Sequence, residues 1–151
     1  MAYDETALLD AIAALVVGLA NYDSTNVSIV DTKPLDAGVA RAVILEEGQL
    51  SSPTDTGYMG YAARTTYGFL VRVYHKYTYD AETQANLRAD VKEIRELLDG
   101  YHRLNSTAEG AKVISASAPQ YVGTANGSGP YFMMRELVYQ VVKLDAITLN
   151  E

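Results

Sequence analysis

Apolar and polar residues alternate along residues 69–79, and this two-residue period predicts a β-strand. One face of the strand would carry Phe69, Val71, Val73, His75, Tyr77 and Tyr79. The other face would carry Leu70, Arg72, Tyr74, Lys76 and Thr78. From Asp80 the period becomes helical, with apolar residues at Leu87, Val91, Ile94, Leu97, Leu98 and Tyr101. Asp80 is predicted to cap this helix, so residues 65–105 predict a strand that runs directly into a long amphipathic helix.

A second amphipathic helix is predicted over residues 4–21. Its apolar face would consist of Leu8, Leu9, Ile12, Leu15, Val16 and Leu19, and acids at its start complement the helix dipole. Further strands are predicted at 27–30, at 38–47 where Gly48 would end the strand, at 112–118 and at 131–148. The last of these is apolar on both faces, so we expect a strand that is central or covered on both sides and that contains a bulge or bend.

These elements predict an α+β fold in a single domain of residues 1–151. Consecutive strands near the end of the chain favour a mostly antiparallel sheet of about four to five strands. Each helix has one apolar face, whereas the strands have two. We therefore expect the two amphipathic helices to be packed on one face of the sheet, with strands 67–79 and 137–144 in that same sheet.

Two long segments lack a sustained period. Residues 49–66 are rich in Ser, Thr, Gly and Pro, and a loop of this length is usually functional or disordered. They also contain residue types that are enriched at protein interfaces, which predicts a contact arm formed by Leu50, Tyr58, Met59, Tyr61 and Arg64. Disorder is the competing explanation. Residues 118–130 are rich in glycine but lack the Lys-Ser/Thr pair of a phosphate-binding loop, so they predict a connection or hairpin tip.

Composition excludes several classes of protein. The chain has 151 residues and no cysteine, so it has no disulfide framework and no thiolate metal site. The first sixty residues carry nine acids and two bases, which accounts for the whole net charge of −7. An acidic surface argues against a conventional nucleic-acid binder. The N-terminal apolar run lacks the basic start of a signal peptide and is too short to span a bilayer, so we expect no membrane association.

The sequence offers little catalytic chemistry. Its two histidines, His75 and His102, are not accompanied by acids at metal-ligand spacing, and two unrelated structural histidines explain them best. No nucleophile elbow of the form G-x-S-x-G occurs. We therefore expect no enzymatic activity and no catalytic residue, metal or cofactor. The twelve tyrosines, beside two phenylalanines and no tryptophan, favour contact surfaces instead, although a small core would account for about half of them.

The order of these elements resembles the tail terminator proteins of long-tailed bacteriophages, the lambda-type family. The resemblance lies in an alanine-rich first helix (ETALLDAIAALVVGLA), a strand followed by a long arm (RAVILEEG, then SSPTDTGYMGYAARTT) and a strand that runs into a helix (FLVRVYHKYTYDAETQANLRADVKEIRELL). Two terminal strands complete it (KVISASA and YFMMRELVYQVVKLDAI). Other phage neck and tail-completion proteins share this size and pattern.

The resemblance implies a virion structural protein that forms a ring, typically hexameric. Such a ring caps the tail tube and joins it to the head connector, so the implied partners are further copies of the chain, the tail tube protein and a head-tail connector or head-closure protein. DNA would pass through the lumen without specific binding, and assembly would take place in the host cytoplasm. The alternatives are another head-tail joining protein or a small-molecule-binding α+β domain with a pocket beneath its helices.

Overall fold

The computed structural model describes residues 5–29, 40–50, 54–55, 62–104, 108–123 and 130–146. The chain begins with helix α1 (Glu5–Val17), followed by strands β1 (Val27–Ile29), β2 (Arg41–Leu50), β3 (Thr54–Asp55) and β4 (Ala62–Lys76). Helix α2 (Asp80–Gly100) then leads to strands β5 (Gly110–Ala116), β6 (Gln120–Gly123) and β7 (Pro130–Ala146). Both predicted helices are confirmed, although α1 ends at Val17 and not at residue 21, and α2 begins at Asp80, which was predicted to be its cap.

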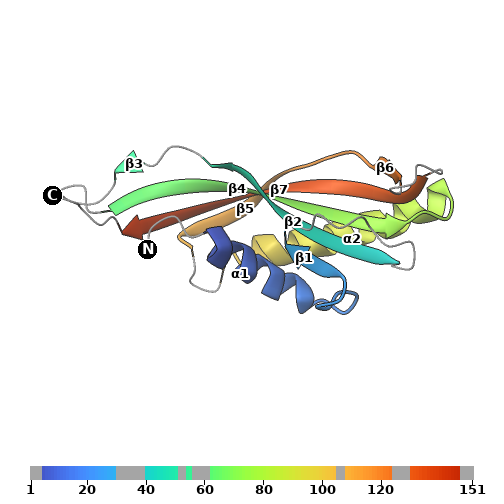
Figure 1. Cartoon of the computed structure of the whole chain (residues 1–151), viewed down its shortest axis with the longest axis horizontal. Helices are drawn as coiled ribbons and strands as arrows, with labels where there is room; N and C mark the ends of the chain where they lie inside the picture. The colour runs from blue at the N-terminus through green and yellow to red at the C-terminus, as the bar shows by residue number, and fades with distance from the viewer. Residues whose placement is uncertain are drawn as a thin grey trace.

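All strands belong to one seven-stranded sheet with the order β1-β2-β4-β7-β5. The pairing is antiparallel except between β1 and β2. β4 and β7 form the centre and pair without interruption from Ala62 opposite Ala146 to Lys76 opposite Phe132. At about 3.3 Å per residue, β4 is roughly 50 Å long, whereas α2 is roughly 30 Å. The two central strands therefore extend along the whole molecule (Figure 1).

Both helices cover the same face of the sheet, which confirms the predicted α+β architecture (Figure 1). The core lies between that face and the helices. It contains Leu8, Ile12 and Val16 of α1, Leu87, Ile94 and Leu98 of α2, and Val43, Phe69, Val71, Val73, Leu137 and Tyr139 of the sheet. The odd-numbered residues of β4 lie on this covered face, as their spacing predicts. The strands 67–79 and 137–144 are also neighbours in one sheet, as predicted.

The strand count exceeds the predicted four to five because two short segments extend longer neighbours. β3 pairs with β4 beyond the end of β2, and β6 pairs with β7 beyond the end of β5. β6 lies within residues 118–130, which we predicted as a connection. Four residues between glycine- and proline-rich flanks give too short a period to recognise.

Of two predictions about strand irregularity, one is wrong and one is confirmed. Gly48 does not end β2, which continues to Leu50 through a shift of register after Glu47. β7 contains no bulge against β4, but its register against β6 shifts between Phe132 and Pro130, where β7 has one residue more than β6. The predicted bulge is therefore present at that end of β7. Further irregularities lie in the shorter strands β2 and β5. The long central pair is therefore regular, and its shorter neighbours adjust to its twist.

Candidate functional site

The face of the sheet opposite the helices is the candidate functional surface, and we call it the open face. It carries the even-numbered residues of β4 and β7, and both helices pack on the other face. A small apolar cluster of Ala42, Ile44, Tyr74 and Phe132 occupies one end. Farther along, Ile114 is 50% exposed and Leu144 is 45% exposed. The end cluster is buried, whereas Ile114 and Leu144 are exposed. A sheet face that only meets water is usually polar, so these two exposed side chains indicate a contact surface.

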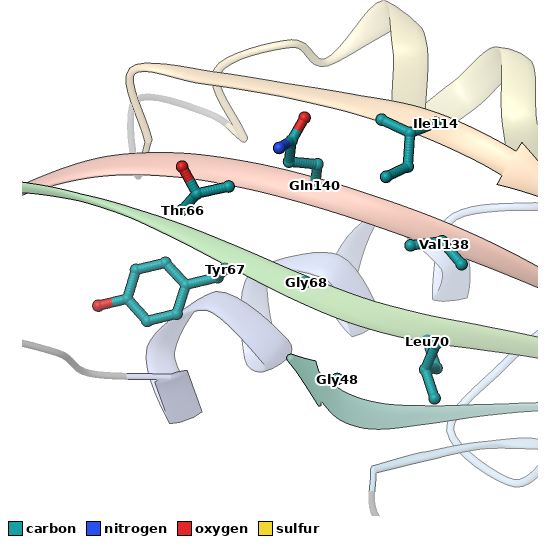
Figure 2. A pocket seen from close by; sticks show the side chains of 8 residues that line it. All are labelled: Gly48, Thr66, Tyr67, Gly68, Leu70, Ile114, Val138 and Gln140. Atoms are coloured by element: carbon teal, nitrogen blue, oxygen red, sulfur yellow. The ribbon is translucent and has the colours of Figure 1, made fainter. Parts of the chain in front are cut away.

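A hollow of about 330 Å³ lies in the middle of the open face, and we call it the central hollow (Figure 2). Its lining consists of Gly48, Thr66, Tyr67, Gly68, Leu70, Ile114, Val138 and Gln140. Gly48 and Gly68 allow β2 and β4 to approach closely, because a Cβ on Gly48 would lie 2.6 Å from the carbonyl oxygen of Gly68. The missing side chains leave the space that the apolar residues surround.

A charged group of three residues crosses the open face beside this hollow. Nε of Arg72 donates to Oε2 of Glu136 over 2.9 Å, and Nη1 of Arg72 donates to Glu46. The three residues come from β4, β7 and β2, so the guanidinium connects three neighbouring strands. The hydrogen bond to Glu136 raises the pKa of Arg72. Because one guanidinium is paired with two carboxylates, the group keeps a net charge of one negative unit.

A second hollow, of about 260 Å³, lies where the turn after α2 meets β5, and we call it the edge hollow. Its lining is His102, Gly110, Ala111, Lys112, Gln140 and Val142. The preceding turn ends at Leu104, which is buried and has a positive φ of 46°. A leucine in this conformation is strained, and the buried side chain holds it there. The turn thereby presents Tyr101, His102 and Arg103 at the surface.

The opposite end of α2 carries a cluster of the exposed Tyr79, Asp80 and Tyr121 with the partly buried Tyr77, which we call the aromatic tip. Oδ1 of Asp80 accepts hydrogen bonds from the hydroxyls of Tyr77 over 3.0 Å and Tyr121 over 2.7 Å. The rings of Tyr77 and Tyr121 meet edge to face at 5.9 Å. These hydrogen bonds raise the pKa of both tyrosines. Tyr121 comes from β6, so the tip joins segments that are far apart in sequence.

The role of Asp80 differs from its predicted one. We expected Asp80 to cap α2, but the N-cap residue is Tyr79 and no side chain caps it. Asp80 belongs to the first helical turn, where its carboxylate binds the two tyrosine hydroxyls instead of a backbone amide. The helix dipole still favours an acid at this position.

A buried polar network lies on the covered face, around Asp90 of α2. Oδ2 of Asp90 accepts from the hydroxyl of Tyr22 over 2.6 Å and lies 2.5 Å from Nε2 of His75. Nη1 of Arg41 donates to the same oxygen over 3.1 Å. Because a carboxylate only accepts, Nε2 of His75 carries the proton in this contact. One carboxylate therefore links α2, β2, β4 and the segment after α1.

The pKa of Asp90 is lower than its ordinary value. Burial alone would raise it, but the hydrogen bonds from His75 and Tyr22 and the charges of His75 and Arg41 outweigh the burial. Burial and the bond to Asp90 raise the pKa of Tyr22. Sequence reasoning missed this network, although a signal was present. Asp90 interrupts the apolar stripe of α2, and His75 interrupts the apolar face of β4. Two polar residues on surfaces that face each other predict a pair.

The predicted contact residues of the 49–66 segment are described only in part. Tyr58, Met59 and Tyr61 lie outside the described residues, and only the backbone of Leu50 is described, as the last residue of β2 opposite Tyr67. Arg64 is exposed in β4, where its Nε donates to Oε2 of Glu109 over 2.8 Å. Parts of the segment predicted as a loop are therefore strand, namely 49–50, 54–55 and 62–66. The predicted role in contact remains a prediction.

The described residues offer contact chemistry. Within them, no three His, Asp or Glu side chains gather at a distance that would hold a metal ion. No helix in the described part of the chain has the length and apolar character needed to span a bilayer. The arrangement instead provides an open face with two hollows and an exposed aromatic tip.

Comparison with known proteins identifies the fold. No protein-family model and no curated protein matches the sequence. Among solved structures, the fold is similar to a chain in the virion of a native gene transfer agent (GTA) particle. The TM-score is 0.53 and the identity 18%, over 89% of this chain and 84% of that chain. A second solved chain gives a TM-score of 0.43 and 14% identity over 97% of this chain and 95% of that chain, a similarity too low to support an argument. The first comparison shows that this chain shares its fold with a virion protein.

Proposed function

We propose that this chain is a structural protein of a tailed phage or phage-like virion, and specifically a tail terminator. In this role copies of the chain form a ring, hexameric as the resemblance implies. The ring caps the tail tube and joins it to a head-tail connector or head-closure protein. The protein would be part of the tail or neck of the virion, assembled in the host cytoplasm, and it would perform no catalytic step.

The open face is the observation that carries the proposal. Its apolar side chains Ile114 and Leu144 remain exposed, because both helices pack on the other face of the sheet. A protein that works in an assembly buries such a face against its neighbours. The shared fold with a chain of a gene transfer agent virion supports the same role. The net charge of −7 suits a lumen that lets DNA pass without binding it.

The test measures assembly. We expect the purified protein to form rings, alone or on addition of tail tube protein, as measured by light scattering after gel filtration and by electron microscopy. The substitutions Ile114→Asp and Leu144→Asp place a charge on the open face at exposed positions, so they should leave the fold intact and abolish assembly with tail tube protein. Asn86→Asp is the matched control, because it adds the same charge at an exposed position of α2.

Three results would contradict this proposal. A chain that remains monomeric at all concentrations and does not bind tail tube protein is not a terminator. A monomer that instead binds a small molecule in the central hollow would favour the alternative of a ligand-binding domain, since about 330 Å³ is near the lower end of ligand pockets. Rings that bind a connector but not tube protein would identify another head-tail joining protein.

A further inference from the structure

The aromatic tip has the properties of an interface anchor. Tyr79 is 59% exposed and Tyr121 is 57% exposed, and tyrosine is among the residues that contribute most to binding. The ring of Tyr121 is held in place by its bond to Asp80 and its contact with Tyr77. A side chain that is fixed before binding loses little conformational entropy when it binds. The tip also carries the charge of Asp80, so it is an aromatic surface beside a carboxylate.

The edge hollow has the complementary properties. Its lining combines the apolar residues Ala111 and Val142 with His102 and Lys112. Arg103 lies in the same turn as His102, and Glu109 nearby is already bound by Arg64. Among the described side chains, this region therefore offers more positive than negative charge around an apolar recess. A tyrosine ring fits such a recess, with its neighbouring carboxylate beside the lysine.

The two sites cannot meet within one chain. Asp80 begins α2 and the edge hollow lies past the end of α2, so the length of the helix, roughly 30 Å, separates them. Figure 1 shows β6 and the start of α2 at one extreme of the long axis, with the start of β5 far from it. Two different patches that complement each other at separate places on one chain produce a head-to-tail contact. Such contacts form a ring where the rotation between neighbours closes, and an open filament where it does not.

We propose that the aromatic tip of one copy inserts into the edge hollow of the next copy, with Tyr121 in the recess and Asp80 beside Lys112. This inference rests on the proposed function, since it names the contact between neighbouring subunits of the ring. It leaves the central hollow and the exposed side chains of Ile114 and Leu144 on the open face to other contacts, such as the one with tail tube protein. The contact is charged, so it should weaken as ionic strength rises.

A charge exchange tests the pairing. Asp80→Lys and Lys112→Asp should each weaken self-association by about tenfold or more, and the double variant should regain it, since each reversed charge again faces its opposite. Glu96→Lys and Arg88→Asp are the matched controls, because they make the same charge reversals at exposed positions elsewhere on α2. Sedimentation velocity measures association, and circular dichroism verifies that each variant is folded.

Cross-linking provides a second test that does not depend on charge. The chain has no cysteine, so only the introduced cysteines can form disulfide bonds. A chain with both Tyr79→Cys and His102→Cys should form a ladder of covalent oligomers on oxidation, because each copy is linked to two others. Each single variant should give no ladder of covalent oligomers under the same conditions. The pair Tyr79→Cys with Glu96→Cys is the control and should give no ladder.

The outcomes separate this inference from the proposed function. Restored association in the double variant, together with the ladder, supports the contact. If the native chain forms rings but both single charge variants form them equally well, the contact is wrong while the proposed function stands. If both single variants fail and the double variant also fails, each residue contacts something else, and the pairing is again wrong. If the native chain never assembles, the proposed function itself fails.

Discussion

Replacing Asp90 by alanine should destabilise the protein more than any comparable change at its surface. Asp90 is 4% exposed and is the common acceptor for Tyr22, His75 and Arg41. Removing its carboxylate leaves these three donors without their partner in the folded state. In the unfolded chain water solvates all three groups, so the loss of hydrogen bonds destabilises the folded state alone.

The magnitude follows from burial. Tyr22 and His75 are buried, and each loses its acceptor at a cost of about 1–3 kcal/mol. The side chain of Arg41 is 31% exposed and can hydrogen-bond to water instead, so the loss of its partner adds little to the cost. The total of about 2–6 kcal/mol brackets the cost of breaking a buried ion pair from one side. For a domain of this size it is a large part of the free energy of unfolding, which is typically about 5–15 kcal/mol.

Urea denaturation followed by circular dichroism measures this loss. With a slope of about 2 kcal/mol per molar, Asp90→Ala should lower the midpoint by about 1–3 M. Tyr22→Phe removes only one donor and keeps the ring, so it should cost less than Asp90→Ala. The surface control Glu96→Ala should stay within about 0.5 kcal/mol of the native chain. An Asp90→Ala variant as stable as the control would refute the argument that this network stabilises the fold.

The same network predicts a dependence on pH. The pKa of Asp90 in the folded protein lies below its ordinary value of 3.8. Below about pH 4 the unfolded chain therefore binds more protons than the folded one, and stability falls as the pH drops through the folded pKa. Above about pH 4 the contribution is complete. Since Asp90→Ala lacks this group, its disadvantage relative to the native chain should shrink on acidification, and a constant difference would contradict the assignment.

Three further changes test other parts of the structure. Gly48→Ala should cost about 1–3 kcal/mol, because its Cβ would meet the carbonyl of Gly68, whereas Gly110→Ala has open space and should change the urea midpoint little. Leu104→Gly should be more stable than Leu104→Ala by about 1 kcal/mol, because glycine adopts the positive φ of this position without strain. Alanine is normally the more stabilising of the two residues, so thermal unfolding of both variants tests the prediction. Asp80→Asn should lower the pKa of Tyr77 and Tyr121 toward the ordinary tyrosine value, which phenolate absorbance measures during a pH titration; an unchanged titration would remove Asp80 from the tip.

The covered face was predictable because burial on it follows a local rule. Alternation in β4 and the helical stripe of α2 depend only on which side of an element faces the core, so Phe69, Val71 and Leu87 were assigned correctly. The short strands and the bulges were not predictable in the same way. β6 exists because β7 offers it a partner, and the register of β2 shifts after Glu47, where Gly48 reaches Gly68. These features depend on neighbours that are distant in sequence.

The aromatic tip shows why function is harder to predict than fold in this chain. A local rule assigns the carboxylate of Asp80 to the amides at the start of α2. Those amides lie at an exposed helix end, where water satisfies them, so they lose little when the carboxylate turns away. Two phenol hydroxyls offer charge-assisted hydrogen bonds in their place, and one of them comes from a strand forty residues later. The chemistry of this surface therefore arises only after β6 has paired with β7. Any contact that uses it depends on the completed fold, which fits a protein that assembles after folding.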